Sequence, residues 1–478
     1  MATKKDLVEA HSFSRRRLVT AFVSGAPGGR EVEPTRPGRT VIGGVALAIL
    51  LVAGAAIASI LNPRAPSDWT DGGLVVSKKG GASYVILEGG DDPELRPVIN
   101  PTSAQLILGS DTEPSFVDQS EIDKYVPGEP IGILDAPATV PDEDMLLDAD
   151  WTACTAEGRG IKVDVSAEQL VTPTTTAGLL VEAGGRFYLV AESERAELGD
   201  QTRAYLYAVP DQGASDLLLQ QLGLGIREEA VRVPEQWLTL FPAGGPLSFS
   251  SFGLTGFGER SPNAGQDGIP TGARIGDRYE SGGIELLLTA EGPVSLDPFA
   301  AAVYASVEKP AGYEPRTLEP EGDPQLTQAV PAYQRANWPA GTLDAVPGEQ
   351  CAVLLPEPDG APVVHIGTDP TADASVEEAA TPRGKVDQTL DAGRGAYVLS
   401  AGWDERRVGS PHFIDSKGIS YALVGREVAD RLGYGDTDPP IVPDTWVELF
   451  DPGVALSVDA ALCPPELPDK RRGSTTCE

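Results

Sequence analysis

Cysteine and histidine are the side chains in this 478-residue sequence that point most directly to chemistry. The four cysteines are Cys154, Cys351, Cys463 and Cys477, and the three histidines are His11, His365 and His412. No two cysteines have the Cys-x-x-Cys spacing of a zinc site or a thioredoxin-type redox site. Three dispersed histidines likewise exclude a histidine-rich metal site. An even number of cysteines without metal-ligand spacing favours disulfides, which persist outside the reducing cytoplasm.

The common catalytic motifs are absent from the sequence. It contains no GxxxxGK[ST] phosphate-binding loop, GxSxG nucleophile turn, HExxH zinc helix or EF-hand loop. The closest match to a phosphate-binding loop, Gly384-Lys385, continues with Val386 and lacks the upstream glycine. We therefore predict no catalytic residue, no metal ligand and no cofactor.

The remaining polar candidates are interpreted as structural. His365 lies in the apolar run 363–366, which favours a strand residue over a catalytic base. His412 lies between a proline and a phenylalanine and is interpreted in the same way. The acidic clusters at 91–92 and 142–144 could act as paired carboxylates in acid–base catalysis. A charged, solvated surface is the interpretation that we favour for both clusters.

Charge is distributed unevenly along the chain. The formal net charge is −34, with 37 Lys and Arg against 71 Asp and Glu. The first forty residues nevertheless carry eight basic and four acidic side chains, so residues 1–40 have a net charge of +4 and the rest has −38. Residues 4–24 are expected to form a short basic helix. The acidic majority of the chain excludes a general nucleic-acid binder, which needs a basic surface.

Residues 41–61, VIGGVALAILLVAGAAIASIL, contain no charged side chain. A helix of 21 residues is about 31 Å long, which matches the hydrocarbon core of a bilayer, so we predict a transmembrane helix. Its basic N-terminal flank should stay in the cytoplasm and the acidic remainder should be exported. The alternatives are a buried soluble helix, a cleaved signal with Ala56-Ile57-Ala58 as its site, and a twin-arginine signal at 14–19. An uncleaved signal anchor is favoured because the possible cleavage site lies inside the apolar run.

Short strand patterns followed by a helical pattern recur four times after the apolar run, which predicts an α+β fold built from repeats. Residues 233–241 (VPEQWLTLF) and 442–450 (VPDTWVELF) form the clearest duplication, and an LGxG sequence precedes each copy. A proline in the first helical turn and an acid after it favour a helix. Trp237 and Trp446 fall at helical spacing with apolar neighbours and are predicted to be buried.

The duplication divides the exported region into two related halves. Cys154 precedes the first copy by 79 residues and Cys351 precedes the second by 91. If the halves pair about a pseudo-twofold axis, equivalent positions can meet on that axis. We therefore predict a Cys154–Cys351 disulfide, worth roughly 4–5 kcal/mol in the chain-entropy model. Cys463 and Cys477 would then close a short proline-rich loop at the C-terminus.

The predicted organisation follows from these features. In chain order it comprises a basic cytoplasmic segment (1–40), a transmembrane helix (41–61), a stalk (62–71), repeat unit 1 (72–126), core segment A with Cys154 (127–180), repeat unit 2 (181–250), repeat unit 3 (251–325), core segment B with Cys351 (326–366), a solvated linker (367–388), repeat unit 4 (389–460) and a C-terminal tail (461–478).

Several of these segments together resemble one family. The similar segments are HSFSRRRLVTAFV at 11–23, Asn62-Pro63 after the apolar run, LRPVINPTSAQLILG at 95–109, PIGI at 130–133, Trp151-x-x-Cys154, the two Val-Pro helices and LGYG at 432–435. In this order they resemble EccB, the single-span membrane component of actinobacterial type VII (ESX) secretion systems. The resemblance covers nearly the whole chain.

The resemblance implies more than the residues do by themselves. It implies an exported domain of four repeat units around a central core with one disulfide, which Cys154 and Cys351 match by position. It implies a plasma-membrane location with a cytoplasmic N-terminus and a periplasmic C-terminal domain. The implied partners are EccC, EccD, EccE, the mycosin protease, membrane lipid and further copies of the chain. The implied role is to organise or cap the complex for protein export, without catalysis.

Two other functions stay open at the level of the sequence. Members of the family have been labelled ATPases, so an exported ATP-hydrolysing subunit is one alternative. It would need a deep pocket lined by convergent acidic groups with perturbed pKa values. A cell-wall-binding module is the other.

Overall fold

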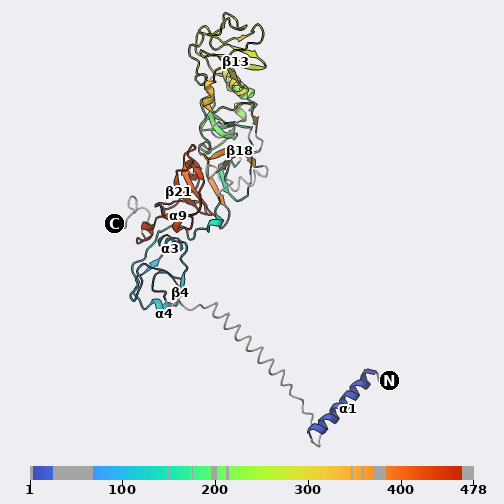
Figure 1. Ribbon diagram of the computed structural model, residues 1–478, viewed down its shortest axis with the longest axis vertical. Helices are drawn as coiled ribbons and strands as arrows, with labels where there is room; N and C mark the ends of the chain where they lie inside the picture. The colour runs from blue at the N-terminus through green and yellow to red at the C-terminus, as the bar shows by residue number, and fades with distance from the viewer. Residues whose placement is uncertain are drawn as a thin grey trace. The chain divides into compact units, whose positions relative to one another are not determined.

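The computed structural model describes residues 4–24 and 68–465, with gaps at 148–150, 157, 169–170, 175, 195–201, 212–214, 346–347, 357–359 and 370–383. The chain divides into two compact units, Met1–Pro66 and Ser67–Glu478 (Figure 1). We call the second unit the body. The predicted transmembrane helix at 41–61 lies outside the described residues, as do residues 62–67 of the stalk and 466–478 of the tail. Among the helices of the described ranges, none is long and apolar enough to cross a membrane.

The first unit contributes one described helix, α1 (Lys4–Ser24), as the sequence predicts. Its large apolar side chains are exposed, and Phe22 is 93% exposed. A helix whose large apolar side chains stay this exposed gains little from packing within the described residues. Its apolar residues are therefore free to contact another molecule.

Four sheets of the body share one topology, in which three antiparallel strands precede a helix and a fourth strand runs parallel to the first. Sheet 1 comprises β1 (Gly73–Ser77), β2 (Ser83–Ile86), β3 (Leu95–Val98), α3 (Pro101–Leu108) and β4 (Ser115–Val117). Sheet 2 comprises β8 (Ala177–Ala183), β9 (Arg186–Glu194), β10 (Thr202–Ala208), α5 (Ser215–Gln221) and β11 (Val231–Arg232), and β16 (Asp344–Ala345) also pairs with β8.

The other two sheets follow the same order. Sheet 3 comprises β12 (Arg278–Ser281), β13 (Ile284–Leu288), β14 (Pro293–Leu296), α7 (Pro298–Ser306) and β15 (Thr317–Leu318). Sheet 4 comprises β20 (Ala396–Ala401), β21 (Ser410–Ile414), β22 (Ile419–Ala422), α9 (Val428–Arg431) and β23 (Ile441–Pro443), with β24 (Asp451–Pro452) added beside β22.

Local sequence explains where the longer helices of sheets 1 and 3 begin. Pro101 and Pro298 each occupy the first turn, where a missing N–H costs no hydrogen bond. The preceding Asn100 and Asp297 cap the two helices by accepting N–H donors from the first turn, each at 2.8 Å. The same cap therefore fixes the chain reversal between the third strand and the helix in both sheets.

A fifth, central sheet joins the two halves of the body. Its strand order is β19-β6-β5-β17-β18-β7. The strands are β5 (Trp151–Cys154), β6 (Ile161–Val165), β7 (Thr172–Thr174), β17 (Glu349–Leu355), β18 (Val363–Asp369) and β19 (Val386–Leu390). The middle pair, β5 and β17, is antiparallel and brings together two strands that lie about two hundred residues apart in the sequence.

The segment predicted as a solvated linker, 367–388, is in part strand. β18 continues to Asp369, and β19 begins at Val386 and pairs in parallel with β6. These short ends add backbone hydrogen bonds to the sheet, a contribution that a search for large apolar side chains overlooks. The prediction was wrong at both ends of the segment, and 370–383 lies outside the described residues.

The hydrophobic cores connect the sheets in a crossed pattern. Sheet 1 shares a core with sheet 4, where α3 packs on α9 and on α11 (Val458–Ala461). Sheet 2 shares a core with sheet 3, where α5 packs on α7. A third core joins the central sheet to sheets 2 and 4. The first sheet of each half thus packs on the second sheet of the other half, and the halves cannot separate without exposing all three cores.

The two Val-Pro segments form single helical turns, α6 (Glu235–Leu238) and α10 (Asp444–Val447). Their prolines lie at the N-cap, one position before the first turn, so the helices are shorter than the sequence suggested. Trp237 and Trp446 are fully buried in the central core, as predicted. Their indole N–H groups donate to the backbone oxygens of Ala153 and Leu240, at 2.9 and 3.2 Å.

Short segments complete the described secondary structure. They are α4 (Gln119–Ile122) and the 3-10 helices η1 (Glu143–Met145), η3 (Arg227–Glu229), η4 (Phe249–Phe252) and η5 (Ala332–Ala336).

Candidate functional site

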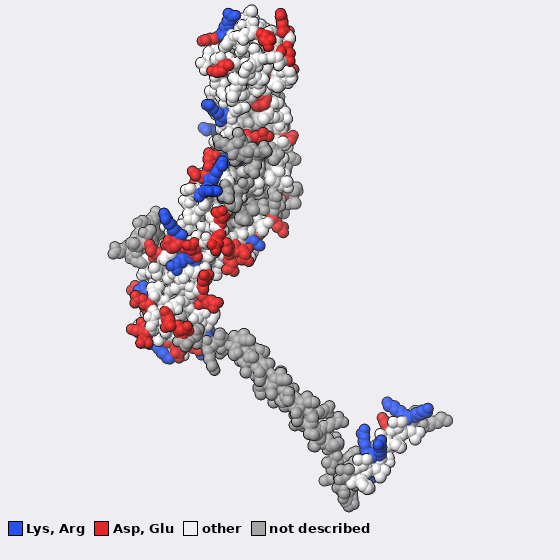
Figure 2. All heavy atoms as spheres, viewed as in Figure 1, with Lys and Arg blue, Asp and Glu red and all other residues white. Residues whose placement is uncertain are grey.

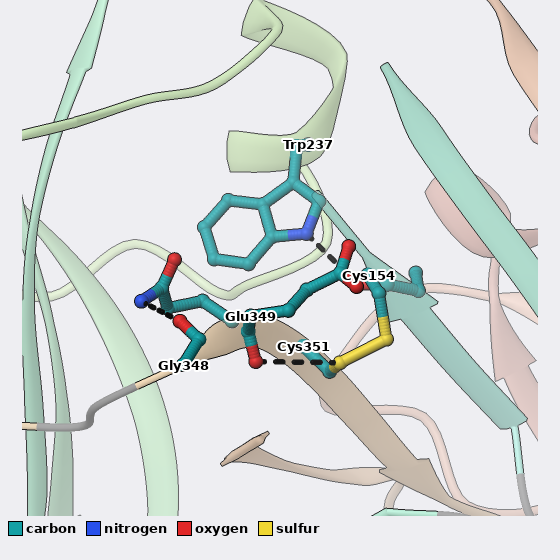
Figure 3. The surroundings of a disulfide bond; sticks show 7 residues. Cys154, Trp237, Gly348, Glu349 and Cys351 are labelled. Atoms are coloured by element: carbon teal, nitrogen blue, oxygen red, sulfur yellow. Dashed lines mark hydrogen bonds between the residues drawn. A yellow bond between two sulfur atoms is a disulfide. The ribbon is translucent and has the colours of Figure 1, made fainter. Parts of the chain in front are cut away.

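Cys154 and Cys351 lie directly opposite each other on β5 and β17 and form a disulfide with an S–S distance of 2.02 Å (Figure 3). The pairing predicted from the two halves is confirmed. Both residues are buried, at 6% and 0% exposure, so soluble reductants have little access to the sulfurs. Cys463 is also disulfide-bonded, whereas Cys477 lies outside the described residues.

The surroundings of the disulfide are closely packed. The indole of Trp237 lies beside β5, and its N–H donates to the oxygen of the residue before Cys154 (Figure 3). The side chains of Val171 and Val353 pack with the two sulfurs in a small apolar cluster. This arrangement fixes the middle of the central sheet and offers no exposed thiol chemistry.

A buried carboxylate that contacts His365 provides a second connection. His365 lies in β18, as predicted, with its Nδ1 3.2 Å from Oε2 of Glu192 in β9. The other carboxylate oxygen of Glu192 accepts the backbone N–H of Ile366 at 2.8 Å. The carboxylate therefore links sheet 2 to the central sheet. Position in the sequence gives no sign of this pair, because its members are separated by 173 residues.

Arg203 of β10 provides a third connection between parts of the body. Its side chain is only 2% exposed and donates to the backbone oxygens of Pro362 and Trp403 at 3.5 and 3.2 Å. The guanidinium also lies over the rings of Tyr205 and Trp403, 5.0 and 5.8 Å from their centroids. A buried cation that is held by carbonyl oxygens and ring faces acts as a structural bridge. The sequence analysis did not single out this residue.

A groove of about 1050 Å³ lies between sheet 3 and the segment that contains η5. The carboxylates of Glu194 and Asp297 line it, together with the aromatic rings of Tyr333 and Trp338. Burial raises the pKa of Asp297, but this side chain already caps α7. Tyr333 donates to the backbone oxygen of Ser295 at 2.7 Å. Asp297 and Tyr333 are thus engaged in supporting the fold.

The acidic clusters lie on the surface. Residues 91–92 and 142–144 are exposed, and Figure 2 shows acidic side chains spread over the visible face of the body in greater number than basic ones. His412 lies in β21 and contacts the oxygen of Ser410 at 2.9 Å. The described ranges contain no cluster of three or more Cys, His, Asp or Glu that could hold a metal ion. For the chain as a whole, the absence of catalytic residues, metal ligands and cofactors stays a prediction.

One carboxyl in the central sheet has a shifted pKa. Burial raises the pKa of Asp164 in β6, and the nearby charge of Asp391 adds to this effect. One oxygen of Asp164 is buried without a hydrogen-bond partner. The charged form of this side chain is therefore disfavoured in the folded protein.

The chain is similar to known proteins over most of its length. Residues 1–466 match the family model described as "Type VII secretion system ESX-1, transport TM domain B". The "ESX-1 secretion system ATPase EccB1" of Mycolicibacterium smegmatis (strain MKD8) is 25% identical over 447 residues, which cover 89% of this chain and 87% of that protein. The "ESX-3 secretion system ATPase EccB3" of Mycobacterium tuberculosis (strain ATCC 25618 / H37Rv) is 24% identical over 481 residues, which cover 92% and 86%.

Two solved structures share the fold. The structure described as "Structure of EccB3 dimer from the ESX-3 core complex" has a TM-score of 0.59 and 20% identity, with coverage of 82% of this chain and 99% of that chain. A chain of the "intact ESX-5 inner membrane complex" has a TM-score of 0.56 and 21% identity, with coverage of 98% and 96%.

The disulfide is expected to stabilise the body strongly. Replacing both residues in a Cys154→Ala/Cys351→Ala variant opens a cross-link between positions 197 residues apart. The free energy of unfolding should fall by about 5 kcal/mol in the chain-entropy model, measured by urea denaturation. A Cys463→Ala/Cys477→Ala variant is the control. Its predicted loop is short, so its loss should be smaller, about 3 kcal/mol. Equal free energies of unfolding for the Cys154→Ala/Cys351→Ala variant and the unchanged chain would show that the disulfide does not stabilise the body.

Asp164→Asn should stabilise the body at neutral pH but not in acid. Because burial raises the folded-state pKa of Asp164, the folded state holds the proton more tightly than the unfolded chain. Well below about pH 4 the carboxyl of Asp164 is protonated in both the folded and the unfolded state. As pH rises through the folded-state pKa, the folded protein has to bury the charged form, and the free energy of unfolding falls. Denaturation at pH 7 should therefore show a gain of no more than about 1 kcal/mol. The exposed Asp91→Asn is the control, and a gain for Asp164→Asn that persists in acid would refute this explanation.

Proposed function

The chain belongs to the EccB family of type VII secretion components, and we propose from this membership that it is a non-catalytic organising subunit of an ESX inner membrane complex. In this proposal, residues 41–61 anchor the chain in the plasma membrane and α1 stays in the cytoplasm. The body lies on the periplasmic side and organises or caps the complex for protein export. Its partners are EccC, EccD, EccE, the mycosin protease and further copies of the chain.

The apolar side of α1 is the observation that carries this proposal. With 3.6 residues per turn, Leu7 and Leu18 lie within about 20° of each other around the helix, and Phe22 lies about 40° further on. These side chains are 64%, 68% and 93% exposed. These three side chains form an exposed stripe that His11 and Arg15 also border, and such a stripe on the described part of the first unit is typical of a docking segment. Docking on cytoplasmic parts of a complex would bury it.

The construction of the body supports the same role. The disulfide, the Glu192–His365 pair and Arg203 each join segments from different parts of the chain. The shared topology of the four sheets and the meeting of Cys154 with Cys351 fit a pseudo-twofold arrangement of two related halves. A stiff body of this kind can hold partners at fixed positions. A relative whose structure is described as a dimer supports self-association of the body.

ATP hydrolysis is the competing function, because the relatives are named as ATPases. The sequence lacks a phosphate-binding loop, and among the described residues the carboxylates at the groove come from two residues, one of which caps a helix. Isothermal titration of the purified full-length chain with ATP and Mg²⁺ separates the two functions. We expect no saturable binding and no phosphate release above that of a heat-denatured sample. Saturable binding together with turnover would overturn the non-catalytic assignment.

Charged substitutions on the apolar side of α1 should detach the chain from its complex. In a Leu7→Asp/Leu18→Asp variant, burying the stripe would place two carboxylates in an apolar contact, which is strongly unfavourable. Recovery of other membrane components with the tagged full-length chain in mild detergent should fall at least tenfold, measured by quantitative mass spectrometry. Phe13→Asp is the matched control. Its side chain is 60% exposed but lies well away from the stripe, so recovery should be unchanged. Equal recovery with the unchanged chain, the double variant and Phe13→Asp would contradict a docking role for the stripe.

A further inference from the structure

The chain enters the body at one end of sheet 1. The ring of Trp69 packs edge-on against Tyr125, with 5.7 Å between their centroids, and Trp69 is only 9% exposed. The backbone N–H of Gly90 donates to Thr70 at 3.1 Å. These contacts hold the first residues of the body beside the segment that follows α4.

Covalent length limits how far this end can be from a membrane. Only residues 62–67 separate the uncharged run from Asp68. Seven residue steps of fully extended chain reach at most about 25 Å. If the run spans the bilayer, as the proposed function requires, the residues around Trp69 stay within that distance of its outer surface.

The side chains at this end of sheet 1 suit an interface between water and lipid. Val126, the residue after Tyr125, is 93% exposed and is the most exposed large apolar side chain in the described part of the body. Phe116 in β4 is 45% exposed and lies three residues before α4. Aromatic side chains near the surface of a bilayer act as anchors, and exposed aliphatic ones enter its headgroup region. Figure 1 shows β4 and α4 together at one end of this sheet.

Carboxylates outnumber basic side chains around this end. Lys124 pairs with Glu121 at 2.5 Å, and Lys78 lies 4.0 Å from Asp118. The backbone N–H of Lys78 also donates to Val117, which places the β1–β2 turn next to β4. Since carboxylates are in excess, attraction to anionic lipid cannot be the main source of contact. Contact between exposed apolar side chains and the headgroup region of a bilayer is favoured instead.

We propose that the β4–α4 end of sheet 1 rests on the outer surface of the lipid bilayer, with Val126 inserted among the headgroups. The proposal depends on the membrane anchor in the proposed function. It adds a second attachment of the body to the bilayer, close to the first. Two attachments restrict the tilt of the body relative to the bilayer, which a single attachment does not do.

A fluorescent label at residue 126 tests the proposal. Val126→Cys introduces a thiol into a chain whose described cysteines are all in disulfides. The full-length variant is labelled with nitrobenzoxadiazole and reconstituted into phosphatidylcholine vesicles, with and without phosphatidylglycerol. Its emission should shift to the blue, and a doxyl-labelled lipid should quench it severalfold more than it quenches the control. The control is Val330→Cys, which is 81% exposed on sheet 3's groove and should report water.

The outcomes separate this proposal from the function on which it depends. Vesicle flotation is measured first. A chain that does not float contradicts the membrane anchor and this contact together. A chain that floats while the label at 126 matches the label at 330 overturns the lipid contact alone. A blue-shifted label that lipid quenchers do not reach would indicate a protein partner and would also overturn it. If the label at 126 were quenched only in vesicles that contain phosphatidylglycerol, the contact would depend on anionic lipid. That result would refute a contact made by apolar side chains.

Discussion

The antiparallel pairing of β5 with β17 is the constraint on which the rest of the body depends. It joins strands from the two halves of the chain, and the register that aligns Cys154 with Cys351 also sets the positions of β6 and β18 on either side. A shift of one residue would turn every side chain of one strand to the opposite face and would separate the cysteines. The disulfide therefore fixes the register of β5 with β17, and the positions of the neighbouring strands depend on this register.

The crossed packing of the sheets extends this constraint outward. Sheet 1 shares its core with sheet 4, and sheet 3 shares its core with sheet 2. Each outer sheet is thus held by an inner sheet from the other half, and both inner sheets pack on the central one. Loss of the central pairing would leave no half with a complete core of its own. This is why a single covalent bond at the centre has a large expected effect on stability.

Sequence reasoning succeeded where a local pattern had one physical solution. Trp237 and Trp446 fall in duplicated apolar segments, and both are buried in the central core. The Cys154–Cys351 pairing followed from the positions of the duplicated segments. Sequence reasoning failed where stability comes from backbone pairing or from partners that are distant in the sequence. β18 and β19 run into a segment that has few large apolar residues, and nothing near Glu192 in the sequence indicates that His365 will lie beside it.

Among the described residues, several buried polar side chains connect distant segments of the chain. Buried polar groups such as Arg203 and Glu192 could in principle have served a reaction, but each is fully engaged in holding two segments together. A catalytic group must instead be left accessible and at least partly unsatisfied until substrate arrives. A body that uses its buried charges in this way gains fixed geometry at the expense of reactivity. Fixed geometry is the property that the proposed organising role requires.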